Sequence, residues 1–168
     1  MKNQLIRSAQ TKMIIHAPKS DVWEKVGFYE HVKKQPGLLL KLSLPIPQQV
    51  EGAYGKVGDT CRCRYSDGGY LTKRITRIHS ENRIEFEIIE QSIRYQNTIK
   101  LLGGYIEVND INGKYSEVNM VTYYESRICV QSISSLFIAA VIKTMHKFVI
   151  RDMQAQLLCQ PLSPIEAA

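Results

Sequence analysis

Between residues 60 and 128 the sequence holds a nearly continuous series of strand-like segments separated by short turn signals. The segments are rich in β-branched and aromatic residues, and Gly, Asn, Asp and Ser lie between them, which is typical of antiparallel strands joined by tight turns. The predicted strands are residues 60–65, 70–78, 83–90, 95–101, 105–109 and 115–128. A further strand at 5–16 gives an expected sheet of seven strands.

The hydrophobic period changes after the last of these strands. Across residues 132–158 the apolar residues recur at helical spacing rather than alternating. One stripe contains Phe137, Val141, Met145 and Phe148, and a second stripe beside it contains Ile138, Ile142, Val149 and Met153. This pattern predicts a long C-terminal helix with a wide apolar face.

The segment after the first strand favours helix and then an irregular connection. Pro18 suits a first helical turn, and Asp21 and Glu24 place negative charge near the positive end of that helix. We therefore expect short helices at residues 18–28 and 29–34. Residues 37–58 show no sustained periodicity, and a connection of this length in a compact domain is often functional. Its leucines would suit a lid over an apolar opening.

Length and charge bound the class of protein. The 168 residues suffice for a single domain, predicted over residues 1–168 with a core at about 5–158. The longest apolar run has seven residues, whereas a membrane-spanning helix needs roughly 20. Without a secretory pattern at its start, the chain is expected to be cytoplasmic with reduced thiols.

The net charge of +6 comes from basic residues scattered along the chain, with no nucleic-acid-binding motif. This favours a solvated basic surface over a nucleic-acid partner. Peripheral contact with a membrane surface and the oligomeric state stay open.

The stretch CRCRYSDGGYLTKR raises the question of a metal or redox site at Cys61 and Cys63. Zinc ligands commonly include cysteines two to four residues apart and converging histidines, whereas these cysteines are one residue apart and the four histidines lie in separate segments. We expect no metal and no cofactor. On a strand, residues two apart share a face, so the two thiols and Tyr65 are predicted to face inward and Arg62 and Arg64 outward.

The order of a strand, short helices, an antiparallel sheet and a long terminal helix resembles the helix-grip fold of the START-like (SRPBCC) superfamily. IIHAPKSDVWEKV resembles the opening of that fold, VGDTCRCRYSDGGYLTKRIT its arginine-containing strand, turn and next strand, and ENRIEFEI its following strand. The resemblance covers roughly residues 5–158. It implies an α+β fold whose curved sheet wraps round the last helix, with a ligand cavity between them. The superfamily includes polyketide cyclases, lipid-transfer domains and plant hormone receptors.

Strand alternation then predicts which side chains line that cavity. The expected ligand-binding residues are Cys63, Tyr65, Lys73, Phe86, Ile88, Thr122, Tyr124, Val141 and Met145. Lys73 is either a ligand anchor or a rim residue, because a buried amine is costly unless it is paired or near water. A shift of one residue in the register would turn Lys73 outward.

Three functions remain open from the sequence. The favoured hypothesis is a binding protein, for transport or sensing of a small hydrophobic or amphipathic molecule, with Lys73, Thr122 or Tyr124 orienting its polar group. The alternative is a metal-independent enzyme of the cyclase or dehydratase kind that depends on His146, Tyr124 or Lys73, although no catalytic residue is assigned and His146 is expected at the edge of the packed stripe. The third is a module that docks a macromolecule through residues 37–58.

Overall fold

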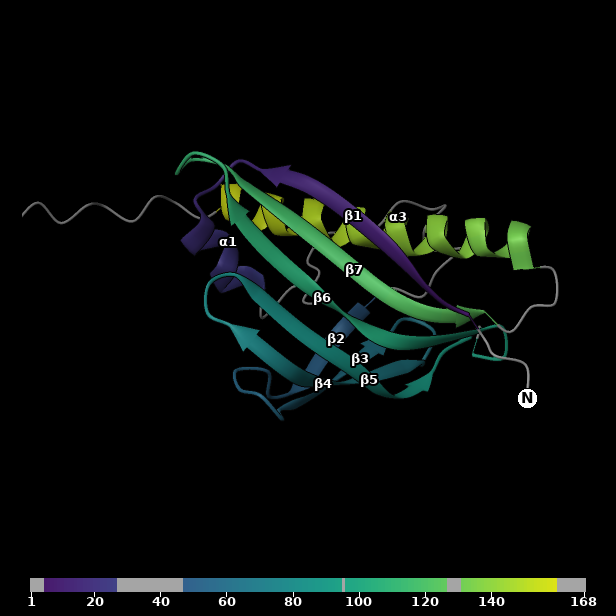
Figure 1. The fold of residues 1–168 in the computed structure, drawn as a ribbon. Helices are drawn as coiled ribbons and strands as arrows, with labels where there is room; N and C mark the ends of the chain where they lie inside the picture. Colours follow the sequence, from purple (N-terminus) through teal and green to yellow (C-terminus); the bar gives the residue numbers. More distant parts are fainter. Residues whose placement is uncertain (1–4, 27–46, 95, 127–130, 160–168) are drawn as a thin grey trace, which may run out of the picture.

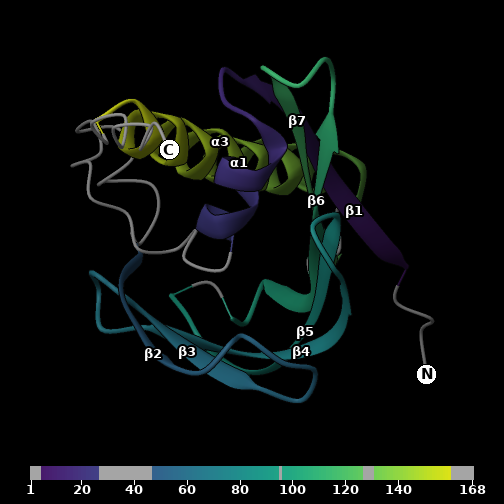
Figure 2. The same ribbon diagram turned by 90° about the vertical axis from the view of Figure 1, so that its left-hand side faces the viewer.

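The structure, a computed structural model, describes residues 5–26, 47–94, 96–126 and 131–159. These residues form a curved sheet with helices on its concave side (Figures 1 and 2). The helices are α1 (Lys19–Val26) and α3 (Gln131–Leu158). The strands are β1 (Ile6–Ile15), β2 (Pro47–Gly52), β3 (Thr60–Tyr65), β4 (Tyr70–His79), β5 (Arg83–Ser92), β6 (Ile99–Asp110) and β7 (Ser116–Ser126).

The sheet has seven strands in the order β1-β7-β6-β5-β4-β3-β2. All neighbouring strands pair antiparallel. In Figure 2, β1, β7 and β6 form one arm of the sheet, and the remaining strands curve away beneath the helices. Helix α3 contacts β1 and β7, and α1 contacts β6. The predicted helix-grip architecture is therefore confirmed.

Two apolar clusters fill the space between α3 and the β1, β6 and β7 arm. The larger cluster joins α1 and the later turns of α3 to the sheet, and its fully buried members include Ile15, Val118 and Ile150. The smaller cluster joins an earlier turn of α3 to the sheet through Tyr124 and Ile138. Burial of this apolar area is the main favourable contribution to folding, and the two clusters fix α3 across the sheet.

Strand β2 lies inside the segment that was predicted to have no regular structure. Its residues, PQQVEG, pair with β3 through partners such as Val50 and Cys63. The sequence gives little sign of this strand, because Pro, Glu and Gly are poor strand formers. The strand forms at the edge of the sheet, with β3 on one side and no strand on the other. Proline has no backbone N–H to donate, and it is tolerated at the first position of such an edge strand, where Pro47 lies.

Strand β6 is one strand where the sequence predicted two, at residues 95–101 and 105–109. The glycine pair does not end the strand; it forms a bulge, where the pairing with β7 shifts between Leu101 and Gly103. Gly103 has a φ of 149°, and a Cβ there would run into the backbone oxygen of Phe86. Glycine is therefore required for a bend within the strand rather than for a turn between strands.

Other predictions differ in detail or cannot be compared. The first helix is described as far as Val26. The predicted helix at residues 29–34 lies outside the described residues, and so do positions 127 and 128 of the last predicted strand. The long helix runs as predicted, but Phe137 is 71% exposed. The more deeply buried face is the second predicted stripe, which includes Ile138, Val149 and Met153.

Candidate functional site

Lys73 lies on the concave face of the sheet and is 6% exposed. Its neighbours across the ladder are Cys61 on β3 and Ile88 on β5. The Nζ atom lies 4.6 Å from the centroid of the Phe86 ring, a distance at which the ring's electrons attract the ammonium group. The inward orientation of Lys73 that the register predicts is thus the one observed.

The CRCR segment also has the predicted faces. Cys61 and Cys63 are buried, at 8% and 1% exposure. On the opposite face, Arg62 Nη2 lies 2.8 Å from Glu90 Oε2, and Arg64 Nε lies 2.8 Å from Glu51 Oε1. The two arginines therefore take part in exposed ion pairs on the outer face. The buried thiols are small side chains of the inner wall.

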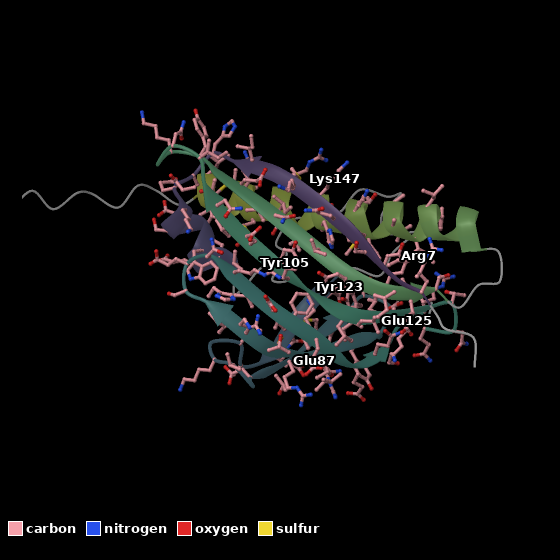
Figure 3. All side chains as sticks on the ribbon, in the orientation of Figure 1. Arg7, Glu87, Tyr105, Tyr123, Glu125 and Lys147 are labelled. Atoms are coloured by element: carbon pink, nitrogen blue, oxygen red, sulfur yellow. The ribbon has the colours of Figure 1, made fainter. Side chains whose placement is uncertain are left out.

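Figure 3 shows the convex face of the sheet, where Glu87 on β5, Tyr105 on β6 and Tyr123 on β7 project from neighbouring strands. Arg74 of β4 pairs with Glu87 at 2.7 Å on this face. Arg74 directly follows Lys73 in the chain, so adjacent basic residues have opposite environments. One is in an exposed ion pair and the other is buried on the concave face.

His146 on α3 is 5% exposed and lies between two threonines. Its Nε2 atom is 2.9 Å from Thr122 Oγ1 on β7, and its Nδ1 atom is 3.2 Å from Thr11 Oγ1 on β1. The imidazole therefore links the last helix to two strands. Thr11, Thr122 and His146 occupy equivalent places on their three elements. In each element, residues of the smaller apolar cluster lie on one side of the contact residue and residues of the larger cluster on the other.

Burial lowers the pKa of His146 to about 4, and the positive charge of Lys73 contributes to the same direction. The ring is consequently neutral near pH 7, with one nitrogen as donor and the other as acceptor. Because threonine hydroxyls both donate and accept, either tautomer is compatible with the two hydrogen bonds.

The sheet register explains how these groups come together. Thr122 lies opposite Gly104 on β6, and Gly104 lies opposite Phe86 on β5. Gly104 has no side chain, and a Cβ there would run into the backbone oxygen of Val121 on β7, so glycine permits the close approach of the two strands. No side chain therefore stands between the threonine and the phenyl ring in this row. With strands about 4.8 Å apart, the Cα atoms of Thr122 and Phe86 are separated by about 10 Å. His146 and Thr122 thus lie at one side of this span, and Lys73, over Phe86, at the other.

The other predicted site residues fall into two groups. Tyr124 is packed in the smaller apolar cluster, is 1% exposed, and has a raised phenol pKa because of its burial. The remaining members are half-buried: Tyr65, Phe86, Ile88, Thr122, Val141 and Met145. By contrast, Ile106 and Val108 of β6 and Val118 and Met120 of β7 are at most 6% exposed. Contact of any of these side chains with a ligand stays a prediction.

Sequence reasoning missed the Thr11 hydroxyl and underestimated His146, which is not an edge residue of the helix. A usable signal was present, since His146 follows Ile142 by four residues and precedes Val149 by three, which places it within the second apolar stripe. Nothing in the sequence shows that Thr11 on the first strand faces this ring.

Over the described ranges, no cluster of three or more His, Cys, Asp or Glu side chains is arranged to hold a metal ion. Likewise, no helix within them is long and apolar enough to cross a membrane.

No protein-family model matches the sequence, and no curated protein matches it. Solved structures match over nearly the full length. A truncated norcoclaurine synthase from Thalictrum flavum has a TM-score of 0.67 at 11% identity, covering 96% of this chain and 99% of that one. The Zhui aromatase/cyclase from Streptomyces sp. R1128 has a TM-score of 0.66 at 11% identity, covering 92% and 94%. Ara h 8.0201 has a TM-score of 0.65 at 10% identity, covering 93% and 100%.

These neighbours are START-like helix-grip proteins, and the chain has their fold. At such low identity the likeness defines the architecture and leaves the chemistry to the site itself.

Proposed function

We propose that the protein binds a small hydrophobic or amphipathic molecule between α3 and the curved sheet. One observation carries the proposal. Lys73 is a buried cation on the concave face, where its neighbours include the thiol residue Cys61 and the Phe86 ring. Ligand sites typically combine a largely apolar wall with a small number of polar groups that orient the ligand.

The degree of burial along the inner face supports the same location. Ile84, Phe86 and Ile88 of β5 point to the concave side yet are only half-buried, whereas Ile106 and Val118 nearer α3 are at most 1% exposed. A ligand over β5 would remove this remaining apolar area from water, at roughly 25 cal/mol per Å². The free energy of binding would therefore come mainly from the β3 to β5 part of the sheet.

The structural neighbours are consistent with a small organic ligand. One norcoclaurine synthase structure of this fold contains dopamine and hydroxybenzaldehyde; it has a TM-score of 0.60 and 13% identity. The binding of such molecules is a property of that protein, and it supports our proposal only by showing that the fold can hold them.

A pair of adjacent substitutions tests the proposed position. Ile88→Trp adds bulk on the inner face, whereas Ile89→Trp places the same indole at a position that is 45% exposed. Native mass spectrometry and titration with 2-decanone should show binding to the wild type and to Ile89→Trp, with most of the affinity lost in Ile88→Trp. Equal binding by both variants, with circular dichroism showing both folded, would refute this location.

The enzyme hypothesis ranks second because of the protonation state of His146. A general base works best when its pKa lies near the working pH, and an imidazole with a pKa of about 4 is a weak proton acceptor at pH 7. If the protein nevertheless turns over a polyketide-like substrate, turnover should be lost in Lys73→Met and His146→Gln while the fold is retained. Docking of a macromolecule through residues 37–58 stays a prediction, as does a cytoplasmic location.

A further inference from the structure

The inner face presents two sets of hydrogen-bonding groups on either side of Gly104. On one side is the ammonium of Lys73, held over the Phe86 ring. On the other is the hydroxyl of Thr122, which contacts His146 Nε2 at 2.9 Å. The row Thr122, Gly104 and Phe86 is continuous across three strands, and its central member has no side chain.

From this geometry, and resting on the proposed function, we infer that the ligand carries a hydrogen-bond-accepting oxygen, either a ketone or a carboxylate, that lies over Gly104 between Lys73 and Thr122. An ammonium group of Lys donates and cannot accept. A cationic head group would lie next to a like charge in a poorly solvated region, which is unfavourable. The site therefore favours an apolar molecule whose polar end is a hydrogen-bond-accepting oxygen over one whose polar end is a charged amine.

The threonine-histidine chain determines how Thr122 can take part. If Thr11 donates its hydroxyl proton to Nδ1, then Nε2 carries the ring proton and donates to Thr122 Oγ1. The Thr122 hydroxyl proton is then available to the ligand. In the other tautomer Thr122 donates to Nε2 and has no proton left for an acceptor. His146 is thus a positioning residue, and the bound state should have the Nε2–H tautomer.

The charge pattern of the interior agrees with this assignment. Buried charged side chains in the described part of the chain are Lys73 and Asp152. Asp152 accepts a hydrogen bond from Gln156 Nε2 at 2.6 Å on the same helix, and it lies six residues beyond His146. The neutral ring of His146 adds no charge near pH 7, so Lys73 supplies the charge next to the Gly104 position.

Three ligands of equal chain length test the inference: decanoate, 2-decanone and decylamine. Calorimetric titration below their aggregation concentrations should give tighter binding of the two acceptors than of the amine. A stronger response to decanoate would identify a carboxylate as the natural head group, and a stronger response to 2-decanone a carbonyl. Decylamine binding as tightly as both acceptors would overturn the inference while leaving apolar binding intact, whereas binding of none of the three would contradict the proposed function itself.

Matched variants locate the discrimination. Lys73→Met removes the charge and keeps an unbranched side chain, and it should weaken acceptor binding about 10- to 100-fold, as expected for a hydrogen bond to a charged group. Arg74→Met removes a positive charge from the next residue on the opposite face and should change nothing. Equal loss in both variants would show that only net charge matters and would overturn the site.

Spectroscopy tests the hydrogen-bond chain of Thr11, His146 and Thr122. Carbon and nitrogen chemical shifts of the His146 ring report its tautomer, and addition of 2-decanone should leave the Nε2–H form dominant in the wild type. Thr122→Val should reduce the affinity for acceptors but leave decylamine binding unchanged. A ligand-bound ring with its proton on Nδ1 would contradict the assigned role of Thr122.

Discussion

Thr122 Oγ1 lies 2.9 Å from His146 Nε2 and thereby joins β7 to α3 at the level where the two apolar clusters meet. Together with Thr11, this contact satisfies both nitrogens of a ring whose residue is only 5% exposed. A buried polar group whose hydrogen bonds are all made lowers the stability of a fold little, whereas the same buried group without a partner is destabilising. The stability of the fold should therefore depend on the protonation of His146.

The first prediction concerns pH. His146 has a pKa of about 4 when folded and about 6.5 when unfolded, so between these values the unfolded state binds more protons. Its contribution is fully present above pH 6.5 and is lost as the pH falls through 4. At about 1.4 kcal/mol per pKa unit, the loss is about 3 kcal/mol. Urea unfolding at pH 7, 6, 5 and 4 should show this fall in the wild type.

The control is His146→Gln, which cannot titrate in this range. Groups other than His146 titrate in both proteins, so the difference between their unfolding free energies isolates the histidine. That difference should shrink as the pH falls. A constant difference from pH 7 to pH 4 would contradict the buried neutral ring.

The second prediction concerns the two threonines. Thr11→Val preserves shape and leaves His146 Nδ1 without its partner at a position where Thr11 is 5% exposed. The unfolding free energy should fall by about 1–3 kcal/mol. Thr122→Val should cost less, because Thr122 is half-buried and water can replace its hydroxyl. Chemical denaturation of the two variants measures both losses of unfolding free energy. A larger loss in Thr122→Val than in Thr11→Val would contradict this prediction.

The third prediction concerns the thiols. In a Cys129→Ser background, a thiol reagent should modify Cys159 rapidly, because that residue is exposed, and should modify the buried Cys61 and Cys63 only after unfolding. Counting modified thiols by mass spectrometry, with and without urea, measures this. Fast modification of three thiols in the folded protein would be inconsistent with inward-facing cysteines on β3.

The fourth prediction concerns the bulge in β6. Gly103→Ala places a Cβ against the backbone of Phe86 at a φ of 149° and should lower the unfolding free energy by about 2 kcal/mol or more. Gly113 also has a positive φ, of 74°, but has open space around it, so Gly113→Ala should cost only about 1 kcal/mol. Equal effects of the two substitutions would mean that the close approach to Phe86 is unimportant.

The regular parts of the fold follow directly from local sequence pattern. Alternation places Cys61, Cys63 and Lys73 on one face and Arg62 on the other, because the side-chain period of a strand is two. The strand β2 could not be predicted in this way, since its formation depends on pairing with β3 rather than on its own composition. The same holds for the continuation of β6 through Gly103, which is favoured by its neighbours on both sides.

The candidate site was only partly predictable for a related reason. The helical stripe containing His146 is visible in the sequence, but which of two adjacent stripes is buried depends on how α3 packs against β1 and β7. The contact with Thr11 joins residues 135 positions apart. Such a pair is a consequence of the sheet order, in which β1 lies next to β7.

The most direct measurement of the central claim is the position of a bound ligand. Isotope-filtered nuclear Overhauser spectra of the labelled protein with unlabelled 2-decanone report which side chains lie beside it. The account predicts contacts from the alkyl chain to Ile88 and Met145, and from the protons next to the carbonyl to Lys73 and Thr122. Contacts confined to exposed residues such as Ile89 and Tyr123, on a protein shown to bind the ligand, would contradict an interior site.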